Sequence, residues 1–215
     1  MRTTILTLLL VVSTHLVQAQ FSTYYYQKKS LFEKLPNDKN EIIFLGNSIT
    51  DGCEWSEIFQ NKKIKNRGIS GDVTDGVLLR LAEVYESSPK KVFILIGIND
   101  LSRGKSQEYV FNNIQKIVQE IHQNSPKTKL FVQSLLPVND CYGRFKKHTN
   151  KNEKVLWINK RLKESASKAS YTFINIHDAF VNESGKMRKD YSNDGLHLLG
   201  DGYMAWVNII KPYVK

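Results

Sequence analysis

The feature that most constrains the fold is the alternation of short, mainly apolar runs with longer amphipathic segments. The apolar runs are Ile42–Leu45, Val92–Ile96, Lys129–Gln133 and Thr172–Ile176, with a shorter one near Ile64–Asn66. Runs of four to six residues without polar alternation are typical of strands that are buried on both faces. This pattern therefore predicts a sheet with both faces covered by other parts of the chain.

Three of the intervening segments repeat apolar residues at helical spacing. They are Ser106–Gln123, Lys151–Ala169 and Leu198–Tyr213. Ser106 is suited to cap the first of them, and Ser125-Pro126 stops it. Strands that alternate with helices predict a parallel sheet between two helical layers. In such folds the ligand site lies beyond the carboxyl ends of the strands.

The N-terminal stretch predicts a targeting signal instead of a part of the fold. Arg2 supplies a positive end, Ile5–Val12 is apolar, and small residues precede a cleavage position after Ala19. We therefore expect a signal peptide over 1–19 and an exported protein, either periplasmic or secreted. The remainder, 20–215, has the size of one domain and contains no linker, no repeat and no apolar segment long enough to cross a membrane.

Charge and cysteine content narrow the range of partners. The net charge is +10, but the lysines are dispersed and do not interleave with aromatic residues, so nucleic acid is not an expected partner. The two cysteines, Cys53 and Cys141, have no metal-site spacing, and no cluster of ligand residues accompanies them. We expect no metal and no cofactor. An exported protein can join two cysteines in a disulfide, and the sequence leaves that question open.

Two segments near opposite ends of the chain carry residues for nucleophilic catalysis. Ser48 follows the first apolar run in a tight Gly-Asn-Ser turn, and Asp194 precedes His197 by three residues. A serine hydroxyl needs a base to take its proton, and the base works best when a third group fixes its tautomer. The sequence predicts Ser48 as nucleophile, His197 as base and Asp194 as the orienting carboxylate. His177, at the end of the last predicted strand, is the second candidate for the base.

Two further strand ends offer hydrogen-bond donors. Gly71 lies in Gly-Ile-Ser-Gly-Asp, and Asn99 lies in Gly-Ile-Asn-Asp. A glycine lets its backbone N–H approach closely, and an asparagine adds an uncharged donor, as stabilisation of an oxyanion requires. Arg103 is placed to meet an anionic substrate or to lie on the surface. Trp55 is placed to line an acyl pocket or to pack against the first helix.

These segments, taken in order, resemble the SGNH (GDSL-type) hydrolase family. The similarity extends from about Ile42 to Tyr203, and the stretch Asn66–Leu81 resembles platelet-activating-factor acetylhydrolase catalytic subunits and carbohydrate O-acetylesterases. The resemblance implies a flavodoxin-like three-layer α/β/α fold with a mostly parallel five-stranded sheet. It also implies an oxyanion hole formed by the Ser48 N–H, the Gly71 N–H and the Asn99 side-chain amide. Asn47 stands where the family's name has aspartate.

The combined interpretation is an exported, metal-independent serine esterase that removes small acyl groups, most simply acetyl, from carbohydrate. A lysophospholipase or acyl thioesterase that uses the same three residues is the alternative enzyme. A carbohydrate-binding module without catalysis is the alternative outside enzymes, and the full set of candidate catalytic residues argues against it.

Overall fold

The structure, a computed structural model, describes residues 21–215, and the predicted signal peptide lies outside them. Five strands form one sheet, in the order β2-β1-β3-β4-β5, and every pairing is parallel. The strands are β1 (Ile42–Gly46), β2 (Ile64–Gly68), β3 (Lys91–Leu95), β4 (Lys129–Gln133) and β5 (Thr172–Ile174). The chain runs outward from β1 to β2 and then returns to the other side of β1. Such a reversal creates the crevice where ligands of parallel sheets bind.

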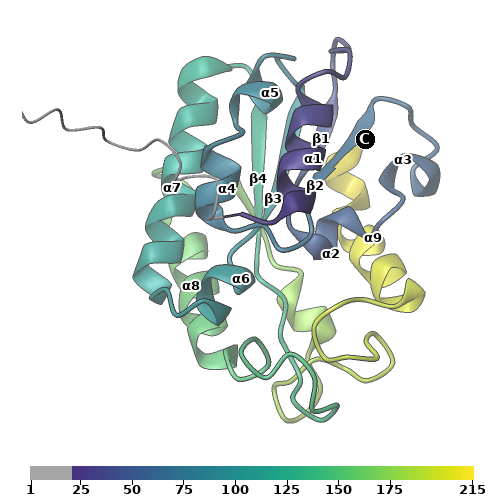
Figure 1. Cartoon of the computed structure of the whole chain (residues 1–215), viewed down its shortest axis with the longest axis vertical. Coiled ribbons are helices and arrows are strands. Elements are labelled where there is room, and N and C mark those ends of the chain that lie inside the picture. Colours follow the sequence, from purple (N-terminus) through teal and green to yellow (C-terminus); the bar gives the residue numbers. More distant parts are fainter. Residues whose placement is uncertain (1–20) are drawn as a thin grey trace, which may run out of the picture.

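Helices cover both faces of this sheet, which confirms the expected three-layer α/β/α fold. In Figure 1, α4, α7 and α8 lie on one side of the strands, and α3 and α9 lie on the other. The longer helices are α1 (Thr23–Phe32), α7 (Gln107–Asn124), α8 (Asn152–Ser165) and α9 (Gly200–Val214). The short ones are α2 (Ser48–Asp51), α3 (Trp55–Ile58), α4 (Thr74–Leu78), α5 (Ala82–Tyr85), α6 (Ile98–Ser102) and the 3-10 turn η2 (His177–Phe180).

Helix α7 forms where its apolar spacing predicts. The Ser106 hydroxyl accepts a hydrogen bond from the Tyr109 N–H at 3.1 Å and so caps the first turn. The apolar face is buried, and the helix ends at Asn124, just before Ser125-Pro126. Helix α8 is shorter than predicted, because it ends at Ser165 and not at Ala169.

Stacked aromatic side chains fill the layer between the sheet and helices α3 and α9. Phe44, Phe93 and Phe131 stand side by side on neighbouring strands, with ring centroids 4.8 and 4.6 Å apart. Trp55 stacks on Phe44 at 4.1 Å and meets Trp206 edge to face at 4.8 Å. Trp55 is therefore a core residue of the first helical layer and is almost wholly buried.

A buried ion network lies behind the carboxyl ends of β1 and β2. Arg80 pairs with Asp72 at 3.0 Å and with Glu83 at 3.3 Å, and Glu83 also pairs with Arg67 at 2.9 Å. The Arg80 guanidinium also donates to the backbone carbonyls of Gly46 and Arg67. It therefore ties together the ends of two strands and the start of the loop that carries Asp72.

We expect Arg80→Ala to lower the free energy of unfolding by about 3–5 kcal/mol, because it leaves Asp72 and Glu83 buried without their shared cation. Chemical denaturation of the folded protein measures this directly. Arg161→Ala is the matched control, since Arg161 pairs with Glu164 on an exposed helix face, where such a pair contributes about 0–1 kcal/mol. Equal losses in the two variants would contradict a structural role for the buried network.

The structure bears on two points that the sequence raised, the pairing of the cysteines and the presence of a membrane-spanning helix. Cys53 is buried and Cys141 is exposed, and they are not bridged. Burial raises the pKa of the Cys53 thiol to about 12, so it stays protonated at neutral pH. Within residues 21–215, the helices are all too short or too polar to traverse a lipid bilayer.

Candidate active site

Ser48 occupies a sharp turn between strand β1 and helix α2. Asn47 caps the helix, since its side-chain oxygen accepts the Ile49 N–H at 3.1 Å, and Ser48 is the first helical residue. The turn requires glycine at position 46, because a Cβ there would lie 2.3 Å from Thr50 Oγ1. The hydroxyl of Ser48 is thus fixed at the carboxyl edge of the sheet, and the Ser48 N–H has no acceptor within the helix.

The Asp194–His197 turn presents the second part of the site. Asp194 Oδ1 accepts the backbone N–H groups of Leu196 and His197, both at 2.8 Å. The other oxygen, Oδ2, lies 2.8 Å from His197 Nδ1. Gly195 has φ +83° and lies against the Asn139 carbonyl, where a Cβ would be only 1.8 Å away. One carboxylate therefore shapes the turn and also holds the imidazole.

These two turns meet, and His197 Nε2 lies 3.0 Å from Ser48 Oγ. A carboxylate can only accept, so the neutral His197 ring carries its proton on Nδ1 and turns the free electron pair of Nε2 toward the serine. Burial acts to raise the pKa of Asp194, but the hydrogen bonds from His197 and from the backbone outweigh it and lower that pKa. Asp194 is therefore ionised at neutral pH.

His177, the other candidate base, is not paired with Ser48. Its backbone N–H donates to Ser134 Oγ at 2.8 Å, and its ring Nδ1 lies 3.3 Å from Asp178 Oδ1. The ring is buried and its Nε2 has no hydrogen-bond partner in the described part of the chain, while burial lowers its pKa. The geometry therefore favours a structural, neutral His177.

The predicted oxyanion donors lie on adjacent loops. Asn99 stands in the first turn of α6, and its amide Nδ2 donates to the Asp72 carbonyl at 2.8 Å, which leaves the second N–H of that amide. Gly71 follows β2 with φ +80°. Arg103 donates from Nη2 to the Gly71 carbonyl at 2.8 Å, so the arginine holds this loop while its side chain remains at the surface.

A buried carboxyl group joins the two donor loops. Asp100 accepts hydrogen bonds from the Thr74 N–H at 3.1 Å and from the Thr74 hydroxyl at 2.5 Å. Burial raises the pKa of Asp100 to about 6, and the bonds from Thr74 oppose that rise. Thr74 begins α4, just after Gly71, and Asp100 adjoins Asn99, so this contact fixes the spacing of the two loops.

The loop between β4 and α8 brings two residues to the site that sequence patterns did not indicate. His148 Nε2 lies 3.0 Å from Asn99 Oδ1, and the Phe145 ring packs edge-on against His197 with centroids 5.1 Å apart. The sequence shows only a basic loop here. The sequence gives one indication that this loop belongs to the site: it follows a predicted strand, at the sheet edge where the other candidate residues lie.

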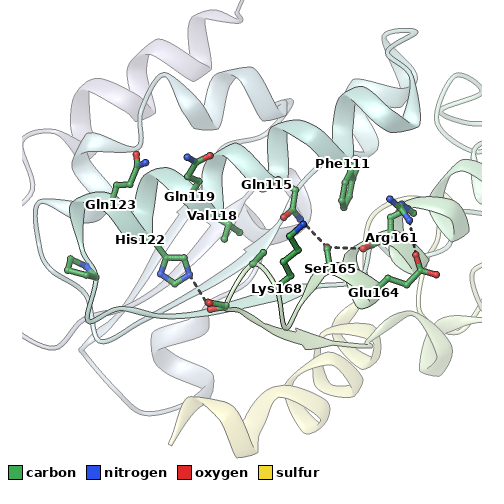
Figure 2. Close-up of a pocket in the computed structure, with 13 residues that line it drawn as sticks. Phe111, Gln115, Val118, Gln119, His122, Gln123, Arg161, Glu164, Ser165 and Lys168 are labelled. Carbon is green, nitrogen blue, oxygen red and sulfur yellow. Dashed lines mark hydrogen bonds and ion pairs between the residues drawn. The ribbon is translucent and has the colours of Figure 1, made fainter.

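A wide groove on the surface is separate from this site. It is a groove of about 870 Å³ between α7 and α8, and Figure 2 shows residues such as Gln115, Gln119 and Arg161 along it. None of the predicted site residues lines it. A much smaller hollow, of about 10 Å³, is lined by Asn47, Ile49 and apolar residues of β3 and the loop after β4, and Ser48 does not line it.

The side chains that commonly bind metal ions were predicted to form no cluster. Across residues 21–215, the His, Cys, Asp and Glu side chains nowhere gather in threes in the arrangement of a metal site.

A parallel sheet with this arrangement of serine, imidazole and strand-end donors defines the class of ester hydrolases with the three-layer fold. The chain belongs to the GDSL-like lipase/acylhydrolase family, which matches residues 44–205. It is 32% identical over 179 residues to rat platelet-activating factor acetylhydrolase IB subunit alpha2, covering 80% of this chain and 73% of the rat protein.

Solved structures agree with this assignment. A GDSL-like lipase from Bacteroides thetaiotaomicron is 27% identical, with a TM-score of 0.77 and coverage of 88% of this chain and 96% of its own. A Streptococcus pneumoniae protein, provisionally described as a platelet activating factor, is 30% identical, with a TM-score of 0.79 and coverage of 89% and 91%. The protein is thus a hydrolase that acts on ester bonds.

Proposed function

We propose that the protein is a serine esterase that removes small acyl groups, most simply acetyl, from carbohydrate after export. The observation that carries the proposal is the chain of hydrogen bonds from Asp194 to His197 to Ser48, with distances of 2.8 and 3.0 Å. It supplies an oriented base for a serine that would otherwise be a weak nucleophile.

In the proposed mechanism, Ser48 Oγ attacks the ester carbonyl while His197 Nε2 takes the hydroxyl proton. The carbonyl oxygen gains negative charge and accepts hydrogen bonds from the Ser48 N–H, the Gly71 N–H and Asn99 Nδ2. His197 then gives its proton to the departing alcohol, and an acyl-Ser48 ester remains. Water, deprotonated by His197, attacks this ester, which releases the carboxylic acid and restores the serine.

The name of a relative supports a short acyl group. The rat protein, 32% identical to this chain, is named an acetylhydrolase, and acetyl is the acyl group that this name specifies.

The deciding experiment is a series of p-nitrophenyl esters from acetate to octanoate. We expect kcat/KM to fall as the chain lengthens. In a pocket that accepts long chains, each added methylene stabilises the transition state by about 1–3 kcal/mol and the trend reverses. Ser48→Ala, assayed with every ester, separates catalysis at this site from spontaneous hydrolysis. An octanoate that is cleaved more efficiently than acetate would move the assignment to a lysophospholipase or thioesterase.

The carbohydrate and export parts of the proposal rest on the resemblance of Asn66–Leu81 to O-acetylesterases and on the N-terminal sequence pattern. A panel of acetylated oligosaccharides, scored by released acetate, tests the first. The N-terminal residue of the protein recovered from the native cells tests the second, and we expect cleavage after Ala19. Release of acetate from lipid esters alone, or an intact Met1 terminus, would count against these parts separately.

A further inference from the structure

His148 contacts the candidate oxyanion hole directly. It lies in the loop that precedes α8, and its Nε2 is 3.0 Å from the side-chain oxygen of Asn99. The ring is half-buried and packs edge-on against Phe145, whose other neighbour is His197. The mechanism above assigns this histidine no role, although it touches one of the three proposed donors.

The hydrogen bonds of Asn99 define which atom faces which partner. The Asp72 carbonyl can only accept, so the amide nitrogen of Asn99 must face it, at 2.8 Å. The amide oxygen therefore faces His148, and because that oxygen can only accept, His148 must carry a proton on Nε2. The neutral tautomer of His148 is thus the opposite of that of His197, which carries its proton on Nδ1.

The surroundings of His148 favour this neutral form. Burial lowers its pKa, and the positive charges of His197, Arg103 and Lys151 lower it further. When His197 becomes protonated during catalysis, a second positive imidazole close by would be repelled. A neutral His148 that donates from Nε2 avoids that repulsion.

We propose that His148 is a positioning residue that fixes the plane of the Asn99 side-chain amide and so aims its second N–H at the oxyanion. The inference rests on the proposed function of the site. One hydrogen bond, to Asp72, leaves the amide able to rotate about its Cβ–Cγ bond. A second bond at the opposite end of the amide holds the plane, so the donor is in place before charge develops.

A double-mutant cycle tests the proposal, with kcat and KM measured on p-nitrophenyl acetate for the wild type, His148→Ala, Asn99→Ala and the double variant. We expect His148→Ala to lower kcat by about 10–100-fold with little change in KM, because an aimed donor acts mainly in the transition state. In the Asn99→Ala background the same change should cost less than about twofold, since no amide remains to be aimed.

Matched variants separate positioning from a general structural effect. His148→Gln keeps an N–H donor and should recover part of the lost kcat, whereas His122→Ala, on the exposed face of α7, should leave kcat unchanged. If His148→Ala does not fold, the cycle is run with His148→Asn. A loss of kcat that persists in full in Asn99→Ala, or a change confined to KM, would overturn the proposal.

A readout without turnover separates this inference from the proposed function. The side-chain NH₂ signals of Asn99 in ¹⁵N-labelled protein should shift and exchange faster with water in His148→Ala, and not in His122→Ala. If the wild type shows no Ser48-dependent hydrolysis, the proposed function fails and these signals still test the contact. If hydrolysis is present and the Asn99 signals do not change, the positioning role fails alone.

Discussion

Ser48→Ala is expected to lower kcat for p-nitrophenyl acetate by roughly four to six powers of ten, to the residual level that binding and oxyanion donors provide without a nucleophile. The hydroxyl is partly exposed and its side-chain hydrogen bond is to His197. The fold should therefore be unaffected, and thermal unfolding of the variant should match that of the wild type.

Ser165→Ala is the matched serine control, because Ser165 lies on α8 and contacts Tyr171 and not the Ser48 site. It should retain full activity. A Ser48→Ala enzyme that keeps more than a tenth of the wild-type rate would exclude Ser48 as the nucleophile. Trapping of a covalent acyl group on Ser48, seen by mass spectrometry after rapid quenching, would provide direct evidence for the acyl-enzyme.

His197→Ala should reduce kcat almost as far as Ser48→Ala, because the serine then has no base. The effects of substituting residues that act as one unit are not additive. The comparison is with His177→Ala, measured in the same assay and over the same pH range. His177 is buried and makes its ring contact with Asp178, so its loss should affect stability more than turnover. If the His177→Ala enzyme is inactive and the His197→Ala enzyme is active, then His177 and not His197 is the base.

Most of the sheet could be predicted because its strands are short apolar runs buried on both faces. β4 was predicted with its observed bounds, and β5 is two residues shorter than its apolar run. The apolar pattern is weakest in β2, because Lys65, Asn66 and Arg67 interrupt it. The structure explains these polar residues, because Arg67 enters the buried ion network and Asn66 bonds the backbone of the α2 turn.

The elements that were not predicted are those whose existence depends on contacts between distant residues. Helices of four or five residues such as α2 and α6 are too short to show periodicity. Helix α1 shows almost no apolar face. It is held instead by particular contacts: the Tyr25 hydroxyl donates to the Gly76 carbonyl, and the Arg67 guanidinium lies over the Phe32 ring.

The site residues also fall into two groups, those that sequence motifs indicate and those that only the folded chain brings to the site. Ser48, Asp194, His197, Gly71 and Asn99 lie in motifs whose residue types suggest a chemistry, and the structure brings the first three into one chain of hydrogen bonds. His148 has no such signal, because its relation to Asn99 exists only once the loop before α8 folds across the sheet edge. From the sequence alone, Trp55 could line an acyl pocket or pack in the core. Its stacking on Phe44 shows that it packs in the core.

The wide separation of Ser48 and His197 along the chain has a consequence for synthesis. The two residues are 149 positions apart, and His197 lies in the turn before helix α9. A growing chain therefore carries the serine long before it carries the imidazole that we propose as its base. On that proposal the hydroxyl stays chemically ordinary until all five strands have been made and the Asp194–His197 turn has closed upon them, so the appearance of esterase activity reports assembly of the whole sheet.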